Sequence, residues 1–129
     1  MFKPKATMSS FSVNDMGKAK EFYTKTLGLE LNSEDMGLNL KLPGGGGLFI
    51  YEKPDHKPAS FTVLNFIVDD IDESADELKK LGVSFERYDN IPGGQDDKGI
   101  ARGIAAKQGP DIAWFEDPAG NILSIMKVE

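Results

Sequence analysis

The feature that most constrains this chain is a repetition: two Pro-Gly turns, far apart in the sequence, lead into strands of the same pattern. Residues 42–51 read Leu-Pro-Gly-Gly-Gly-Gly-Leu-Phe-Ile-Tyr, and residues 117–126 read Asp-Pro-Ala-Gly-Asn-Ile-Leu-Ser-Ile-Met. A shift of 75 positions aligns Pro43 with Pro118, Gly45 with Gly120, Leu48 with Leu123 and Ile50 with Ile125. Pro and Gly favour tight turns, and apolar alternation is typical of strands. The repetition indicates a chain built from two similar units.

The beginnings of the two halves repeat as well. A shift of 55 positions aligns Phe11 with Phe66, Val13 with Val68 and Asp15 with Asp70. With one residue deleted in the following helix, Leu27-Gly28 aligns with Leu81-Gly82. In each half the Asp can cap the helix and the Gly can end it. Agreement at both ends of each half predicts the order β-α-β-β-β, twice.

We therefore expect one α+β domain made of two βαβββ modules, at about residues 5–53 and 61–129, with a polar linker at 54–60. The expected strands cover residues 6–13, 29–31, 38–42, 48–52, 61–68, 83–88, 104–107, 112–116 and 122–126. The expected helices follow Asp15 and Asp70 and end at Gly28 and Gly82, and a long loop covers residues 89–103.

The composition fits one globular domain and excludes several classes of function. The 129 residues include no cysteine, which excludes disulfides, thiolate zinc sites and cysteine nucleophiles. No apolar run is typical of a signal peptide or a membrane span. The net charge of −6 and the scattered lysines disfavour nucleic acid as a partner. The absence of cysteine suits a reducing compartment, and we expect a cytoplasmic protein.

A single helix can cover only one face of its sheet, so the other face of each module needs a different cover or lines a cavity. Alternation predicts that this second face carries Met8, Ser10, Phe49, Tyr51, Val63, Asn65, Ser124 and Met126. Apolar, aromatic and small polar side chains together are typical of a small-molecule pocket, here a cleft between two curved sheets. The alternative is that these side chains fill a closed sandwich.

Two motifs resemble those of the vicinal oxygen chelate superfamily, which contains glyoxalase I, the bleomycin resistance proteins and the extradiol dioxygenases. Residues 12–29, Ser-Val-Asn-Asp-Met-Gly-Lys-Ala-Lys-Glu-Phe-Tyr-Thr-Lys-Thr-Leu-Gly-Leu, are similar to its opening V-x-D…F-Y…L-G signature. Residues 114–123, Trp-Phe-Glu-Asp-Pro-Ala-Gly-Asn-Ile-Leu, are similar to its closing F-x-D-P-x-G-N turn. The resemblance covers essentially the whole chain, and it implies the paired βαβββ fold and commonly a homodimer.

Metal enzymes of this superfamily carry His or Gln, Glu, His and Glu at four strand positions. The resemblance places Met8, Phe49, Val63 and Ser124 at these positions. Hard divalent ions bind carboxylate, carbonyl or imidazole groups, and this set offers one hydroxyl. We therefore expect neither the family's usual metal site nor another cofactor.

Two other groups of residues offer candidates for a displaced metal site. His56, the only histidine, is flanked by Glu52 and Asp55, but its place in the linker favours a solvated side chain. The pair Asp96-Asp97 can bind a cation loosely, although a polar loop is the preferred interpretation. No Ser-His-Asp set is expected, because the only histidine lies in the linker.

The loop 89–103 is long enough to serve as a lid or a binding loop. Arg102 and Lys98 either contact an acidic ligand or offset the acidic residues of the loop. Trp114, the only tryptophan, either stacks on a planar ligand or packs in the core.

Taken together, these features predict a protein that binds a small, largely apolar or planar organic molecule in a metal-free cleft, as in drug sequestration. The residues expected to contact the ligand are Met8, Ser10, Phe49, Tyr51, Val63, Asn65, Arg102, Trp114, Ser124 and Met126. Two alternatives are a glyoxalase-like lyase or dioxygenase that uses a displaced metal site, and a non-catalytic dimeric interaction subunit.

Overall fold

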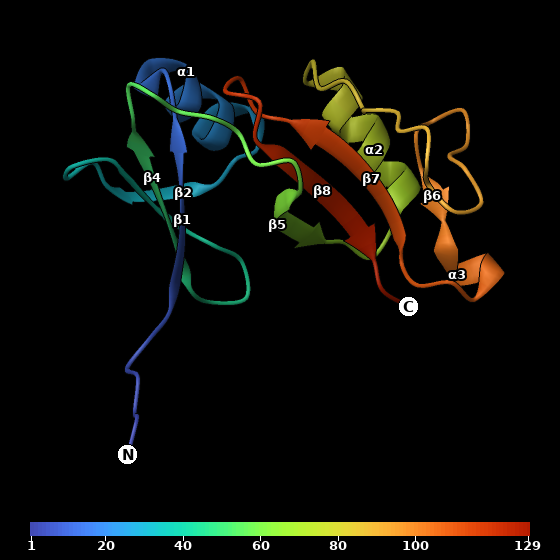
Figure 1. Ribbon diagram of the computed structural model, residues 1–129, viewed down its shortest axis with the longest axis horizontal. Coiled ribbons are helices and arrows are strands. Elements are labelled where there is room, and N and C mark those ends of the chain that lie inside the picture. Colours follow the sequence, from blue (N-terminus) through green and yellow to red (C-terminus); the bar gives the residue numbers. More distant parts are fainter. The chain divides into compact units, whose positions relative to one another are not determined.

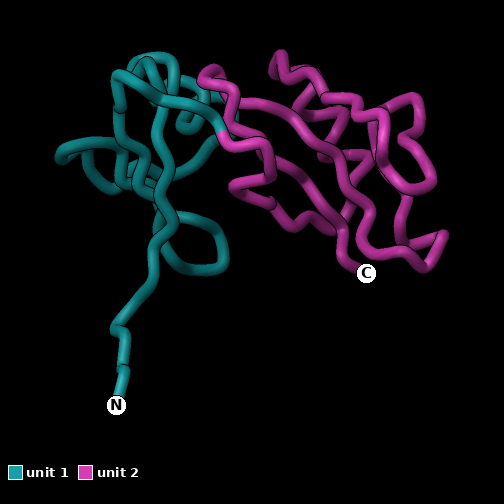
Figure 2. The backbone as a smooth tube through the Cα atoms, viewed as in Figure 1, with its two compact units in different colours: residues 1–58 teal, residues 59–129 magenta.

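The computed structural model describes residues 1–129, and its internal contacts divide the chain into two units (Figure 2). Unit 1 comprises Met1–Pro58, and unit 2 comprises Ala59–Glu129. The boundary lies within the segment expected as a linker. Each unit has its own sheet and its own helix.

Unit 1 contains a four-stranded sheet and one helical segment. Its elements are β1 (Met8–Val13), α1 (Met16–Lys20), η1 (Glu21–Thr26), β2 (Glu30–Ser33), β3 (Leu38–Lys41) and β4 (Gly47–Glu52) (Figure 1). The strand order is β1-β4-β3-β2, with β1 parallel to β4 and the other neighbours antiparallel. This is the β-α-β-β-β order that the repeat predicts.

Unit 2 has the same topology with one additional short helix. Its elements are β5 (Thr62–Ile67), α2 (Ile71–Lys80), β6 (Ala101–Arg102), α3 (Gly103–Ala106), β7 (Asp111–Glu116) and β8 (Ile122–Lys127). The strand order is β5-β8-β7-β6, with β5 parallel to β8. The α+β class and the doubled βαβββ topology predicted from the sequence are confirmed.

The predicted capping residues begin and end both main helical segments. The carboxylates of Asp15 and Asp70 each accept a 3.0 Å hydrogen bond from the backbone N–H three residues later. Gly28 and Gly82 follow the helices with φ of +71° and +93°, a region that residues with a Cβ rarely adopt. The π-helix η1 places Tyr23 in the core of unit 1. No helix is both long and apolar enough to cross a membrane.

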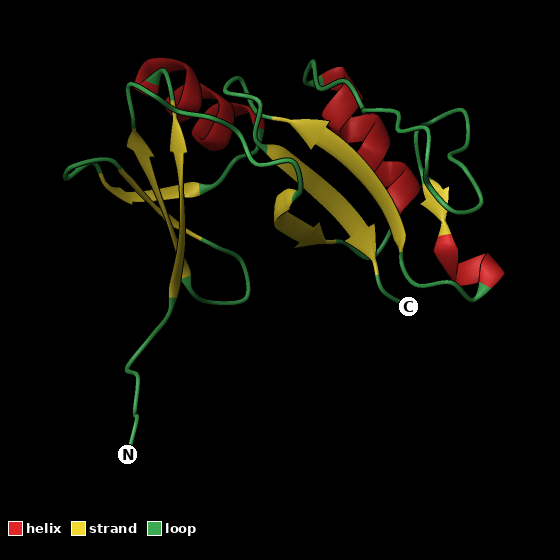
Figure 3. Cartoon of the chain, viewed as in Figure 1, coloured by secondary structure: helices red, strands yellow, loops and turns green.

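Each sheet buries the face that its helix covers. In unit 2, α2 packs along β7 and β8 (Figure 3), and Ala113, Phe115 and Leu123 are fully buried. In unit 1, Leu48 and Ile50 of β4 are buried in the same way. Because strand side chains alternate between faces, the residues between these positions lie on the opposite faces.

The expected strand at 83–88 is wrong as a continuous element. A single bridge joins Phe85 to Phe115, and Glu86 N donates a hydrogen bond of 2.8 Å to Trp114 O. The chain then leaves the edge of β7 and returns to it only at β6. The edge of β7 is thus shared by two short segments, with the predicted long loop between them.

Gln95 provides the physical reason for this interruption. Its side-chain amide accepts a hydrogen bond from Tyr88 N (2.9 Å) and donates to Glu86 O (3.0 Å) and Gly99 O (2.7 Å). One side chain therefore supplies partners that a strand would otherwise find in its neighbour.

The expected strand at 104–107 is also wrong, because α3 occupies Gly103–Ala106. The buried carboxylate of Asp111 accepts a hydrogen bond from Ile104 N (3.0 Å) and so stabilises the start of this helix. A Cβ at Gly103 would collide with the carbonyl oxygen of Pro110. The turn between α3 and β7 therefore depends on a contact between segments that alternation does not reveal.

Candidate functional site

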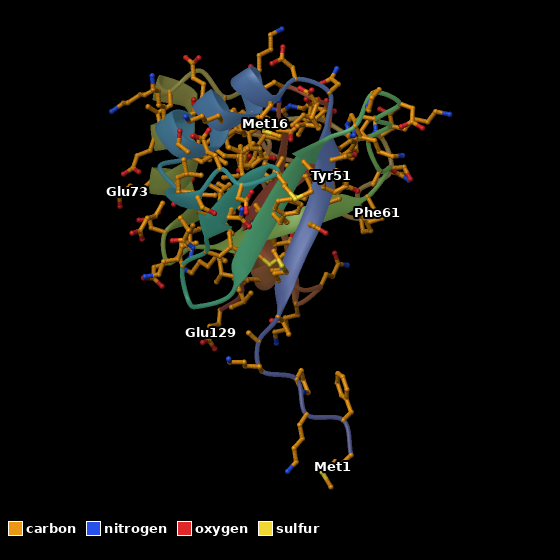
Figure 4. All side chains as sticks on the ribbon, turned by 90° about the vertical axis from the view of Figure 1, so that its left-hand side faces the viewer. Met1, Met16, Tyr51, Phe61, Glu73 and Glu129 are labelled. Atoms are coloured by element: carbon orange, nitrogen blue, oxygen red, sulfur yellow. The ribbon has the colours of Figure 1, made fainter.

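The second face of the unit 1 sheet carries an aromatic pair beside two serines. The register of β1 and β4 places Ser10 opposite Phe49 and Ser12 opposite Tyr51. The rings of Phe49 and Tyr51 stack, with centroids 5.9 Å apart and planes inclined by 19°; Tyr51 is labelled in Figure 4. Met8 begins β1 on the same face and is 59% exposed. These four predicted residues of unit 1 therefore share one face.

In unit 2, the register brings Asn65, Ser124 and Trp114 into one row across β5, β8 and β7. Ser124 is fully buried, and its hydroxyl donates a short hydrogen bond to Asn65 Oδ1. Met126 pairs with Ile112 and lies on the same face as Ser124. Three residues predicted from alternation, Asn65, Ser124 and Met126, thus lie on the face opposite α2. Trp114, for which the sequence leaves both a ligand contact and a core position open, lies on the same face.

Val63 departs from the regular alternation. Thr62 and Leu64 pair with consecutive residues of β8, so Val63 is the extra residue of a β-bulge. The cross-strand neighbour of Ser124 is therefore Asn65 rather than Val63. A bulge is decided by pairing with the neighbouring strand, and alternation within one strand cannot predict it.

The four positions that hold metal ligands in the metal enzymes do not offer a ligand set here. Met8, Phe49 and Val63 supply thioether and hydrocarbon groups, and the hydroxyl of Ser124 is bonded to Asn65. No group of three or more His, Cys, Asp or Glu side chains in residues 1–129 is arranged to hold a metal ion. The residues present do not fit a hard divalent ion, which prefers carboxylate, carbonyl or imidazole ligands.

His56 is not the solvated linker residue expected from the sequence. Its Nδ1 lies 2.6 Å from the hydroxyl of Ser12, and its side chain is half-buried. The flanking carboxylates have other partners, because Glu52 caps the start of α1 and Asp55 pairs with a neighbouring lysine. His56 therefore ties the linker to β1 instead of joining these carboxylates in a cluster.

Arg102 and Lys98 are engaged by carboxylates of unit 2. Arg102 donates two hydrogen bonds to Asp72 of α2 (3.0 and 2.7 Å) and one to Asp96 (3.0 Å). Lys98 lies 3.3 Å from both Asp72 and Asp76. The hydrogen bonds from Arg102, followed by that from Lys98, lower the pKa of Asp72 to about 2. Both cations therefore offset acidic residues of the chain: Arg102 pairs with Asp96 of the loop, and both contact Asp72 of α2, a partner that was not expected.

Asp96 organises the long loop. Its carboxylate accepts hydrogen bonds of 2.9 Å from Lys98 N and Ile100 N, besides the one from Arg102. Burial alone would raise the pKa of Asp96, but the hydrogen bonds from Ile100, Arg102 and Lys98 lower it below its usual value. The carboxylate is thus held by the loop itself, in agreement with the polar-loop interpretation.

Two cavities flank Trp114, which is half-buried. The first, of about 250 Å³, has a lining that includes Phe61, Thr62, Tyr88, Ile91, Trp114 and Ile122. The second, of about 230 Å³, has a lining that includes Ile91, Pro92, Ala101, Pro110, Ile112 and Trp114. Ile91 of the long loop lines both, and the Tyr88 ring meets the Trp114 indole edge-on, with centroids 5.5 Å apart. The indole is therefore packed on one side and open to two cavities.

Three polar residues beside Trp114 were not predicted from the sequence. The hydroxyl of Tyr88 is buried without a hydrogen-bond partner. Burial, followed by the charges of Glu86 and Glu116, raises the pKa of Tyr88. Burial, followed by Glu86 and Asp117, also raises the pKa of Glu116. Alternation along β7 could have identified Glu116, but Glu86 and Tyr88 lie in the segment where the expected strand is interrupted.

A third cavity, of about 400 Å³, lies at the end of α2; of the residues considered as ligand contacts, only Lys98 lines it. Its lining includes Lys79, Phe85, Arg87, Asp97 and Lys98. It is rimmed by charged side chains, whereas the cavities at Trp114 are lined largely by aromatic and aliphatic groups.

Comparison with known proteins agrees with the motifs in both halves. The model of the Glyoxalase/Bleomycin resistance protein/Dioxygenase superfamily matches residues 7–125. Among solved structures, the chain is similar to TnmS3, an antibiotic binding protein from Streptomyces sp. CB03234, with 25% identity, coverage of 99% of this chain and 100% of that one, and a TM-score of 0.68.

Two further solved structures share this similarity. A glyoxalase/bleomycin resistance protein from Streptomyces sp. CB03234 is 26% identical, with coverage of 93% of this chain and 99% of that one and a TM-score of 0.60. A glyoxalase family protein from Enterococcus faecalis is 23% identical, with coverage of 98% and 99% and a TM-score of 0.67, a likeness of fold alone. No curated protein matches the chain.

Proposed function

Because the chain belongs to the Glyoxalase/Bleomycin resistance protein/Dioxygenase superfamily, we propose that it binds a small, largely apolar or planar organic molecule. The observation that carries this proposal is the position of Trp114, half-buried between two cavities on the sheet face opposite α2. Tyr88 and Ile91 extend the apolar surface around the indole. The ligand would lie against this surface.

The energetics favour such a ligand. Burial of apolar surface contributes roughly 25 cal/mol per Å², less the free energy of immobilising the ligand. Offset or edge-on contact with an aromatic ring adds about 0.5–1.5 kcal/mol. The side chains around Trp114 therefore suit an aromatic or aliphatic body, and Asn65, in the same row, is the nearby exposed polar group.

Two further observations support the proposal. TnmS3, an antibiotic binding protein, is similar to this chain over its whole length. In unit 1, Phe49 and Tyr51 form another aromatic surface, with Met8 and Ser10 on the same face, of the kind that an apolar or planar molecule contacts. Binding of this kind depends on shape and apolar area, and it needs no metal ligand at the four positions discussed above.

The test is a calorimetric titration of 1-naphthol and quinoline into the wild-type protein and into Trp114→Ala. We expect the variant to lose about tenfold in affinity, since aromatic contact and area burial together exceed 1 kcal/mol. The control is Phe2→Ala, which removes an exposed aromatic ring that lines neither cavity. Equal affinity of the wild type and Trp114→Ala, or no binding to either, would overturn the proposal.

A further inference from the structure

The 250 Å³ cavity is bounded by aromatic rings from three different segments. Phe61 precedes β5 and is 68% exposed (labelled in Figure 4), Tyr88 follows the bridge to β7, and Trp114 lies within β7. The face of an aromatic ring carries negative electrostatic potential, and it attracts ammonium and quaternary nitrogen groups within about 6 Å. Three rings around one cavity therefore suit a positively charged group as well as an apolar one.

Two acidic residues, Glu86 and Glu116, lie near these rings, and the charges of both act on the Tyr88 hydroxyl. The backbone of Glu86 is held beside that of Trp114 by the hydrogen bond from its N–H to the carbonyl oxygen of Trp114. Glu116 follows Trp114 by two positions on β7, so it shares the same face, and it pairs with Ile122, which lines the cavity. Neither carboxylate takes part in any of the ion pairs of unit 2.

The charges of this region lack a counter-ion. Burial and the two carboxylates raise the pKa of Tyr88, and burial followed by Glu86 raises that of Glu116. These shifts have the direction expected where negative charge accumulates in a partly dry site. The nearby cations of the loop are occupied, because Arg102 bonds to Asp72 and Asp96 and Lys98 contacts Asp72.

From this juxtaposition of aromatic rings and unpaired carboxylates, we infer that the ligand is an organic cation, with an ammonium or quaternary nitrogen group lodged by Trp114 between Glu86 and Glu116. The inference rests on the proposed function and adds the charge of the ligand to it. The apolar body of the ligand would occupy the cavity, and its charged group would replace the counter-ion that the chain does not supply.

The experiment uses three soluble compounds of similar size and different charge: phenethylammonium, 2-phenylethanol and 3-phenylpropanoate. Each is titrated into the full chain while the indole N–H resonance of Trp114, the only tryptophan, is followed by NMR. We expect phenethylammonium to bind roughly fivefold or more tightly than 2-phenylethanol, and 3-phenylpropanoate to bind more weakly than both. Raising the salt concentration from 20 to 150 mM should lower the affinity for phenethylammonium and leave the affinity for 2-phenylethanol unchanged.

Charge variants separate this site from the general negative charge of the protein. Glu116→Gln and Glu86→Gln should each reduce the preference for phenethylammonium over 2-phenylethanol by roughly threefold or more. Glu77→Gln, which removes the same charge from α2, is the matched control and should leave the preference unchanged. The inference is supported if Glu86→Gln and Glu116→Gln reduce the preference for phenethylammonium and Glu77→Gln does not.

The remaining outcomes overturn it in distinguishable ways. If the alcohol binds as tightly as the cation, or if Glu77→Gln acts like the two site variants, the inference fails while the proposed function stands. If none of the three compounds moves the Trp114 resonance, the inference fails, and the naphthol and quinoline titration above decides the proposed function separately. Binding of 3-phenylpropanoate at the cavity beside Lys79 and Arg87 would leave the Trp114 resonance in place, so it is distinguished from binding at Trp114.

Discussion

Asp72 on α2 and Arg102 in β6 form a bidentate ion pair, with hydrogen bonds of 2.7 and 3.0 Å to the two carboxylate oxygens. The pair joins the helix to a two-residue edge strand, and Asp96 contacts the same guanidinium. It anchors the end of the long loop, whose residue Ile91 lines both cavities at Trp114. The residue expected to reach a ligand therefore fixes the loop that borders the candidate site.

Replacing Asp72 by Asn is expected to lower the free energy of unfolding by about 0.5–1 kcal/mol at pH 7, because the pair is partly exposed and screened by solvent. The pKa of Asp72 in the folded protein, about 2, lies below its ordinary value of 3.8. The stabilisation is therefore fully present above pH 3.8 and is lost as the pH falls towards 2. Urea unfolding at pH 7, 4 and 2.5 measures this loss.

The control for this series is Asp55→Asn, which removes an exposed ion pair with Lys53. This substitution should change the stability less than Asp72→Asn at pH 7, because a single exposed contact is worth little. A difference between wild type and Asp72→Asn that stays constant from pH 7 to 2.5 would contradict the assigned pairing.

Two isoleucine substitutions should identify which cavity holds the ligand. Ile122 lines the 250 Å³ cavity and Ile112 lines the 230 Å³ cavity, and both side chains are half-buried on strands of the same sheet. Ile122→Arg is expected to reduce ligand affinity about tenfold or more, since the longer side chain fills the cavity and places a cation opposite Glu116. Ile112→Arg should have a smaller effect, and melting curves establish that both variants fold. The reverse order of effects would assign the ligand to the other cavity.

Chelation of metal ions is expected to leave the protein unchanged. The side chains of Met8, Phe49, Val63 and Ser124 do not provide the carboxylate and imidazole groups that a divalent ion requires. Thermal unfolding with and without EDTA should therefore give the same melting temperature within about 1 °C. Stoichiometric metal in the purified protein, or a melting temperature lowered by several degrees, would show a metal site formed by other residues.

The homodimer implied by the family resemblance stays a prediction. β1 and β5 are edge strands of their sheets, and each carries an exposed apolar residue, Met8 (59%) and Ile67 (68%). Exposed strand edges of this kind are usually covered by another chain or segment. Light scattering should give twice the chain mass of 14.1 kDa at micromolar concentration. A mass of one chain at every concentration from 5 to 200 µM would refute it.

Local sequence signals determined most of the fold. Asp15 and Asp70 cap helices, and Gly28 and Gly82 end them, because capping and left-handed backbone conformations depend on residues that are neighbours in the chain. Alternation correctly predicted that Ser124 and Met126 share a face, because the strand that carries them pairs regularly with its antiparallel neighbour. Repetition of these signals then predicted that both halves have one topology.

Only the tertiary structure decided the details that shape the candidate site. The bulge at Val63, the interruption after Glu86 and the helix at Gly103 depend on hydrogen bonds or close contacts with other segments. Arg102 has its main partner 30 positions away in Asp72, so no local pattern could choose between a ligand and a structural carboxylate. Each of these hydrogen bonds or ion pairs contributes only about 1 kcal/mol, and each joins residues that are distant in the sequence. The sequence therefore determined the topology of two βαβββ units. Pairing between distant residues decided which polar groups lie near Trp114 and which are hydrogen-bonded or ion-paired within the protein.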